Sequence, residues 1–208
     1  VASNPVQGVV GYKPPNSDAG SDLYLMDYIG MFGVSLVPDS KYPENAKVIF
    51  LPTQAAADKH ITEKILKSLD QGAKIIMTTG FMAKANSGEK LATLAQIKWP
   101  LTTTSITTQT VISEGKEYAL KIPVSMDYQI IPDGANVLLQ AATPASDPFL
   151  VQNQNGNISI LNTHTFSQED FDAVGEVLLS PRQLGMLEFP RQWVNTIRGV
   201  FRSDGEPG

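Results

Sequence analysis

The sequence predicts an α/β fold, a three-layer sandwich in which helices cover a mainly parallel sheet, with an antiparallel β-rich extension in its second half. Residues 48–51 and 75–77 are short apolar runs, and an amphipathic segment with helical spacing separates them. This order of strand, helix and strand is typical of a βαβ unit, which pairs its strands in parallel. After Pro100 the chain becomes rich in Thr, Val, Ile, Tyr and Ser, which favours antiparallel strands.

The N-terminal part predicts a strand, a helix and a second strand before the βαβ unit. Residues 6–12 are suited to a strand, and the two prolines of residues 13–16 end it, because proline cannot donate to a central ladder. A helix is expected from about Ser21, where apolar residues fall near helical spacing. Residues 34–37 then read as a short strand, which residues 38–39 close.

Residues 58–71 form the clearest helical pattern of the chain. Apolar residues share one face of this segment and charged residues share the other. Asp58 can cap the start of the helix, and Gly72 can adopt the left-handed conformation that ends it. Another helix is expected from Ser87 to Ile97, where apolar residues again follow helical spacing.

The second half of the chain predicts hairpins. Glu114-Gly115 separates two β-rich stretches, and Asn155-Gly156 separates residues 149–152 from residues 157–161. Asn-Gly between apolar runs is the strongest short-range signal of a hairpin. These strands, together with residues 136–141, are expected to complete the far edge of the sheet.

The C-terminal part predicts two closing helices, at residues 166–179 and 183–200, and a disordered polar tail at residues 203–208. A length of 208 residues fits one α/β domain over residues 1–200 better than two independent cores. Residues 101–135 are then a β-rich insertion or an edge of that domain.

Composition excludes several classes of function. The net charge is −5 and the lysines are scattered, so nucleic acid is not expected as a partner. Apolar runs are only a few residues long, and a membrane span needs about 20. The chain has no cysteine and two histidines, and its first strand lacks a Gly-x-Gly-x-x-Gly pattern. We therefore expect no disulfide, no metal site and no cofactor.

Several segments follow one another in an order that is shared with a known superfamily: 21–24, 30–33, 37–38, 46–51, 58–72, 75–80 and 148–161. This order resembles the class I glutamine amidotransferase-like domains, which implies a flavodoxin-like fold. It is most similar to non-catalytic versions, such as the middle (trimerisation) domain of bacterial β-galactosidases and trehalose-utilisation-type proteins. The resemblance covers residues 5–98 and 136–180, through the order of elements more than through identity.

The resemblance implies that the reaction centre has been lost. Working amidotransferases carry a cysteine on a tight turn after a central strand, and a histidine with a carboxylate two residues further on. The corresponding turn here is Thr79-Gly80, or Thr78-Thr79, and a threonine hydroxyl has too high a pKa to replace a thiolate without an activating base. His164 lies near the place of the histidine, but the residue two positions on is Phe166.

Six polar or small residues are the candidate ligand-binding residues, because parallel sheets bind ligands at the carboxyl ends of their strands. They are Asp18, Asp22, Gln54, Thr79, Gly80 and His164.

Each candidate also has a structural interpretation. Asp18 and Asp22 can form a carboxylate pair of the glycosidase kind, or an Asx turn and a charge at a helix terminus. Gln54 can bind a ligand, cap the next helix or bridge loops. Thr79 can satisfy local backbone groups, and His164 can be a general base or a hydrogen-bonded structural residue.

The leading hypothesis is a non-catalytic accessory or assembly domain of a larger bacterial carbohydrate-active protein. Its expected partner is a glycoside-hydrolase-type domain in the same protein, or a second subunit, with carbohydrate as a further ligand. The alternative is a hydrolase or sugar-binding module that uses the carboxyl-end rim. The start at Val1 fits a mature form or an excised module, and a periplasmic or extracellular setting is favoured by the resemblance.

Overall fold

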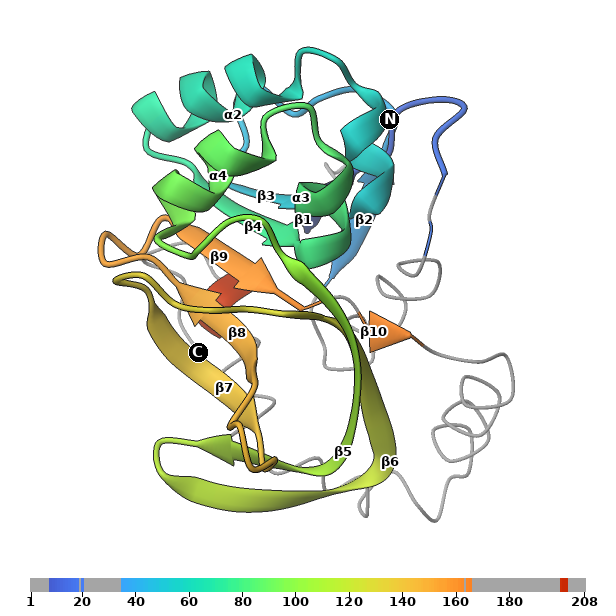
Figure 1. Cartoon of the computed structure of the whole chain (residues 1–208). Helices are drawn as coiled ribbons and strands as arrows, with labels where there is room; N and C mark the ends of the chain where they lie inside the picture. Colours follow the sequence, from blue (N-terminus) through green and yellow to red (C-terminus); the bar gives the residue numbers. More distant parts are fainter. Residues whose placement is uncertain (1–7, 19, 21–34, 163, 166–198, 202–208) are drawn as a thin grey trace.

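The computed structural model describes residues 8–18, 20, 35–162, 164–165 and 199–201. Within them, ten strands form one sheet in the order β10-β6-β5-β7-β8-β9-β4-β3-β1-β2 (Figure 1). The strands are β1 (Val9–Tyr12), β2 (Leu36–Asp39), β3 (Val48–Leu51), β4 (Lys74–Thr78), β5 (Thr102–Ser113), β6 (Lys116–Gln129), β7 (Asn136–Ala141), β8 (Pro148–Gln152), β9 (Ile158–Leu161) and β10 (His164–Thr165). The helices are η2 (Thr53–Ala57), α2 (Ile61–Asp70), α3 (Thr79–Lys84) and α4 (Gly88–Ala95).

One half of the sheet is parallel and runs β2-β1-β3-β4-β9. The predicted βαβ unit lies at its centre, with Val48 opposite Lys74 and Leu51 opposite Met77. All four residues of β3 are buried, as expected for a parallel strand that is covered on both faces. The α/β fold class is therefore confirmed.

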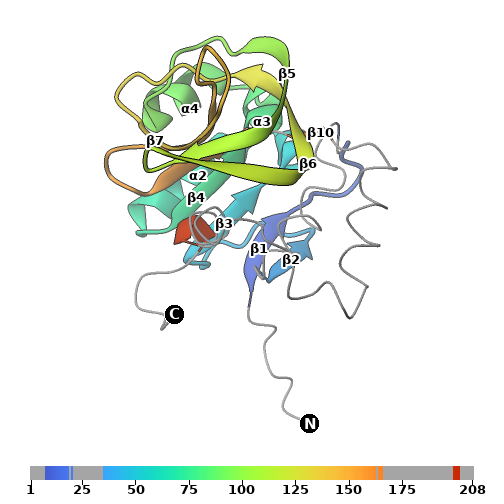
Figure 2. The ribbon, with the colours of Figure 1, turned by 90° about the horizontal axis from the view of Figure 1, so that it is seen from below.

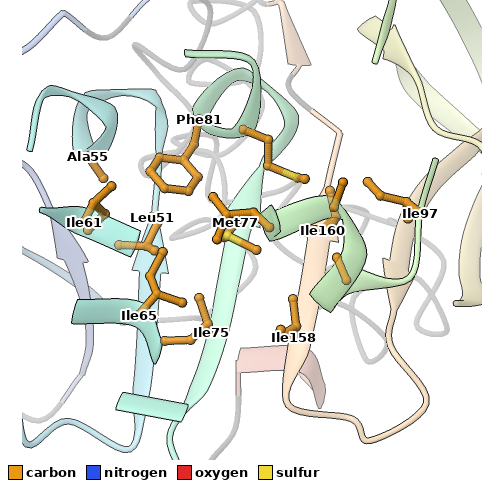
Figure 3. Packing of buried hydrophobic residues seen from close by; sticks show 14 of the residues in the cluster. Leu51, Ala55, Ile61, Ile65, Ile75, Met77, Phe81, Ile97, Ile158 and Ile160 are labelled. Carbon is orange, nitrogen blue, oxygen red and sulfur yellow. The ribbon is translucent and has the colours of Figure 1, made fainter. Parts of the chain in front are cut away.

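One face of the parallel half is covered by α2, α3 and α4 (Figure 1). Figure 3 shows how this core is built from alternate residues of the strands, which point toward apolar residues of the helices. Leu51, Met77 and Ile160 meet Ile61 and Phe81 in this layer. Burying one such Leu, Ile or Phe side chain stabilises the fold by about 1.5 to 3 kcal/mol.

The opposite face of the same strands has its own apolar cluster, which contains Phe50, Ile76, Val200 and Phe201. The rings of Phe50 and Phe201 lie 5.5 Å apart. Figure 2 shows the short red segment 199–201 beside β3 on this side of the sheet. Because side chains alternate along a strand, Phe50 and Leu51 belong to different clusters although they are neighbours in sequence.

Local sequence signals fix the ends of the helices on the first face. Gly72 has φ +84° and follows Gln71, the C-cap residue of α2, which confirms the predicted helix end. The predicted helix start is wrong: α2 begins at Ile61, His60 is its N-cap residue, and no side chain caps it. The carboxylate of Asp58 accepts the backbone N–H of His60, before the helix begins. At the end of α4, Gln96 has φ +59° although it is not glycine.

Gln96 anchors two other segments. Its carbonyl accepts the N–H groups of Asp133 and Ala135 at 2.7 and 3.1 Å. Its side-chain oxygen accepts the N–H of Gln154 at 2.6 Å. The end of α4 is thereby tied to the chain before β7 and to the turn between β8 and β9.

The other half of the sheet is antiparallel and begins at β9, which pairs with β8. Both predicted hairpins are confirmed. Glu114 and Gly115 have φ +50° and +75°, the positive values that a two-residue type I′ turn needs at both positions. Asn155-Gly156 lies in the turn that joins β8 to β9. The long β5–β6 hairpin curves away from the helices in Figure 1.

Two expectations about the sheet are wrong. Residues 136–141, 149–152 and 157–161 do not complete its far edge, because β9 pairs with β4 and lies in the middle of the strand order. The second strand covers residues 36–39 and so includes Pro38. Proline is tolerated there because β2 is an edge strand that pairs only with β1 among the described strands.

Some expected elements lie outside the described residues: the helix from Ser21, nearly all of the closing helices at 166–179 and 183–200, and the tail at 203–208. In the part of the chain that is described, no helix has the length and apolar character to span a membrane.

Candidate functional site

The carboxyl ends of β3, β4 and β9 place polar residues together at one edge of the parallel half. β4 ends at Thr78, whose hydroxyl accepts the backbone N–H of Phe81 at 3.0 Å. This cap starts α3 immediately after the strand, so Thr79 and Gly80 lie in the first turn of a helix and are buried. The sequence did not predict α3, because its six residues are too few for a periodic pattern.

Thr79 is joined to Asn162, the first residue after β9. The Thr79 hydroxyl donates to the side-chain oxygen Oδ1 of Asn162 at 3.0 Å. The side-chain nitrogen of Asn162 donates to the carbonyls of Tyr128 and Pro148, at 2.5 and 3.4 Å. Both Thr79 and Asn162 have no exposed surface. The pair therefore links the parallel half of the sheet to β6 and β8 of the antiparallel half.

Asn162 was not among the predicted site residues. The sequence feature that could have identified it is an amide side chain directly after the buried strand Ile158–Leu161, at the same edge as Thr79. The bond between them could not be predicted, because 83 positions separate the two residues.

Gln54 lies in η2, directly after β3, and is only 6 % exposed. Its side-chain oxygen Oε1 is buried and has no hydrogen-bond partner among the described residues. Capping of the next helix, one of the alternative roles of Gln54, is not seen, since α2 has no side-chain cap at its start. A buried amide oxygen without a donor costs about 1 to 3 kcal/mol. Gln54 is therefore the one predicted site residue with an unused acceptor within the described part of this edge.

Asp18 lies on the loop after β1 and reaches α3. Its carboxylate forms an ion pair with Lys84 at 3.2 Å, and it accepts the N–H of Gly20 at 3.0 Å, which is the predicted Asx turn. The bond from Gly20, followed by the one from Lys84, lowers the pKa of Asp18 below its ordinary value. Asp18 is exposed, with 83 % of its side chain accessible. Asp22, its proposed partner, lies outside the described residues.

His164 is the first residue of β10, and its backbone pairs with Met126 of β6. Because only one residue separates it from Asn162, their Cα atoms lie within about 7 Å of each other. The backbone of His164 is therefore near the Thr79–Asn162 pair, while its side chain is outside what the structure describes.

A second polar cluster lies where β1 ends and α2 begins. The carboxylate of Asp58 accepts the Tyr12 hydroxyl at 2.8 Å and the Lys64 ammonium at 2.6 Å. The ammonium also lies 5.9 and 5.7 Å from the ring centres of Tyr12 and Tyr42, at cation–π distance. We call these four residues the Asp58 clasp.

The groups of the Asp58 clasp shift one another's pKa. Burial raises the pKa of Tyr12, and its bond to the Asp58 carboxylate raises it further. Burial alone would raise the pKa of Asp58, but the bonds from Lys64, the His60 backbone and Tyr12 together lower it below its ordinary value. Every polar group of the clasp has a partner in the fold, so this cluster is structural.

The candidates are thus only partly gathered. Gln54, Thr79 and Gly80 lie on the neighbouring segments η2 and α3, and Asp18 is attached to α3 through Lys84. The described residues contain no group of three or more His, Asp or Glu that could hold a metal ion. Hydroxyl and amide groups at this edge can hydrogen-bond a neutral polar ligand, and the ionisable side chains described beside them, Asp18 and Lys84, form an ion pair with each other.

Solved structures with a similar fold include PurLQS from Thermotoga maritima, with a TM-score of 0.55, 16% identity and coverage of 92% of this chain and 96% of that one. A ThuA-like protein from Bacteroides uniformis has a TM-score of 0.55 at 12% identity, with 96% and 95% covered. A β-galactosidase from the haloarchaeon Halorubrum lacusprofundi has a TM-score of 0.53 at 14% identity.

These neighbours are consistent with the amidotransferase-like superfamily that the sequence resembles, and at such low identity they show the fold alone. The match covers 83% of this chain but only 30% of the β-galactosidase, so the similarity is to one part of that enzyme. No curated protein sequence matches the chain. A family model matches residues 6–166, and the chain therefore belongs to the family described as "Uncharacterized protein SSO3021, second domain".

Proposed function

We propose that this chain is a non-catalytic accessory or assembly domain of a larger carbohydrate-active protein. The similarity to part of a β-galactosidase and to a ThuA-like protein fits an accessory domain. The family description refers to a second domain, which suits a module that works beside another. The proposed partner is a glycoside-hydrolase-type domain of the same protein, or a second subunit.

The bond between Thr79 and Asn162 carries the proposal. A hydroxyl nucleophile needs a base to accept its proton, and the Thr79 proton points to an amide oxygen, which is not a base at neutral pH. The same amide supports the junction between the two halves of the sheet through its nitrogen. Thr79, at the turn that corresponds to the cysteine turn of working amidotransferases, thus helps to hold the two halves of the sheet together.

Analytical ultracentrifugation tests the assembly role. The chain is examined alone over a range of concentrations, and then mixed with the domain that adjoins it in the reading frame. We expect either self-association or a complex with the neighbouring domain. A chain that remains monomeric and binds no adjoining domain would contradict the proposal.

The alternative is a hydrolase or sugar-binding module at the carboxyl edge, and the unused oxygen of Gln54 favours it. A ligand hydroxyl or N–H that reached this atom would remove the cost of the unpaired acceptor. Galactose and trehalose titrations followed by amide NMR shifts test this option. Shifts at residues 53–54 and 79–80 that disappear in Gln54→Leu would support it, and unchanged spectra would exclude these sugars.

If the alternative includes catalysis, it predicts an activity that can be measured separately. If the edge hydrolyses glycosides, the purified chain should release nitrophenol from nitrophenyl glycosides, and His164→Ala should abolish the release. The accessory role predicts no release by either protein. An activity that survives His164→Ala would point to contamination and would not support the alternative.

A further inference from the structure

The turn between β8 and β9 is held by amide side chains. Asn153 accepts the backbone N–H groups of Asn157 and Ile158, both at 3.1 Å, and donates to the Asn157 side chain at 2.8 Å. Gln154 donates its side-chain N–H to the carbonyl of Gly134 at 2.6 Å. These bonds keep the flanks of the turn in place.

Asn155, at the tip of the same turn, differs from its neighbours. It is exposed, and its side chain makes no hydrogen bond with the described residues. It is followed by Gly156, and this is the single Asn-Gly pair of the chain. Around Gly156 there is space: one atom, the side-chain oxygen of Gln152 at 3.9 Å, lies within 4 Å of the place a Cβ would take.

We propose that Asn155 is a site of spontaneous deamidation through a succinimide. The backbone nitrogen of Gly156 loses its proton and attacks the side-chain carbonyl carbon of Asn155. A C–N bond forms, the bond to the side-chain nitrogen breaks, and that nitrogen leaves as ammonia with the proton. Water then opens the ring on either side, which gives aspartate or isoaspartate. No oxidant, metal or enzyme takes part.

The glycine that follows Asn155 should make this asparagine react faster than the other asparagines of the turn. A side chain on the following residue would crowd the attacking nitrogen, and glycine also adopts the backbone angles of the ring most readily. At the other amides of the turn the next residue is Gln154 for Asn153 and Ile158 for Asn157, and both carry side chains. The side chains of Asn153 and Asn157 are also held by the bonds described above.

One bond protects the site in the folded chain. The N–H of Gly156 donates to the carbonyl of Asn153 at 3.0 Å, so the attacking nitrogen becomes free only when the tip of the turn opens. The folded chain should therefore react more slowly than the unfolded one. Each product carries an extra negative charge, and isoaspartate also lengthens the backbone of the turn by one carbon.

The test is peptide mass spectrometry of the whole chain after incubation at neutral and mildly alkaline pH, with digestion at acid pH. We expect the peptide with Asn155 to gain the mass of an NH-to-O exchange and to resolve into aspartyl and isoaspartyl forms, at a severalfold higher rate than Asn86. Asn86 is the internal control, because it is exposed and precedes Ser87. The Asn155→Gln variant should lose the product, because its ring would need an extra atom.

A sample unfolded in urea completes the design. If this sample is converted while the native chain gains no more at Asn155 than at Asn86, the fold protects the site and the proposal is wrong. The proposal is equally wrong if Asn155→Gln shows the same mass gain in this peptide. Circular dichroism of the variant confirms that the substitution leaves the fold intact.

Discussion

The buried hydrogen bond between Thr79 and Asn162 depends on a single hydroxyl, so its contribution to stability can be measured by removing that group. Thr79→Val removes the donor to Asn162 and keeps the shape of the side chain. We expect a loss of about 1 to 3 kcal/mol in the free energy of unfolding, because a buried amide oxygen loses a partner. Urea unfolding measures it, and Thr79→Ser is the control that keeps the hydroxyl. Equal stability of Thr79→Val and wild type would show that the bond contributes nothing.

Ser113, at the end of β5, is a buried residue whose hydroxyl, unlike that of Thr79, is not hydrogen-bonded within the described residues. Only 2 % of its surface is exposed. We expect Ser113→Ala to leave stability unchanged or to raise it by up to about 1 kcal/mol, because a desolvated hydroxyl without a bond is removed. Thermal unfolding tests this expectation. In the same strand, Thr108 is buried and bonds to Thr110, so Thr108→Val should lower the midpoint.

At the scale of elements, the Asp58 clasp fixes the start of α2 against the end of β1 and should make stability depend on pH. The folded chain holds the pKa of Asp58 below its ordinary value of 3.8, so the unfolded chain takes up this proton more readily. The contribution is complete above about pH 3.8 and is lost as the pH falls through the lower folded pKa.

Urea unfolding of wild type and Asp58→Asn between neutral pH and pH 2 to 3 measures this contribution. The variant should be less stable at neutral pH, and the difference should shrink in acid. Other carboxylates act on both proteins alike, so only the difference reports on Asp58. A difference that does not change with pH would show that the clasp is not electrostatic.

The elements that the sequence predicted well are those with local signals. The apolar composition of Val48–Leu51 predicts a buried strand. The backbone preferences of Gly72 and Asn155-Gly156 predict a helix end and a turn. The central place of β9 was missed because strand pairing is long-range: Ile158 lies opposite Ile75. The sheet edge of the candidate site was predictable, but the contact between Thr79 and Asn162 depends on that pairing.

At the scale of the whole molecule, the two apolar clusters share one sheet and should unfold together. Phe50→Ala removes a ring from one cluster and Leu51→Ala a side chain from the other. We expect losses of about 3 to 5 and 2 to 5 kcal/mol, each in a single transition. Calorimetry with intrinsic fluorescence checks this, and Val137→Ala, at a 40 % exposed residue, should change little. Two separate transitions would mean that the two clusters unfold independently.

The left-handed turn at Gln96 also limits how this domain can vary in length. One residue added to α4 would rotate everything after it by about 100°. The carbonyl and side chain of Gln96 would then point away from Ala135 and Gln154 together, so both attachments would be lost at once. At the tip of the β5–β6 hairpin there is more space, since no atom of the described residues lies within 4 Å of the Cβ position of Gly115. Natural insertions should therefore accumulate at the tip of the β5–β6 hairpin and spare α4.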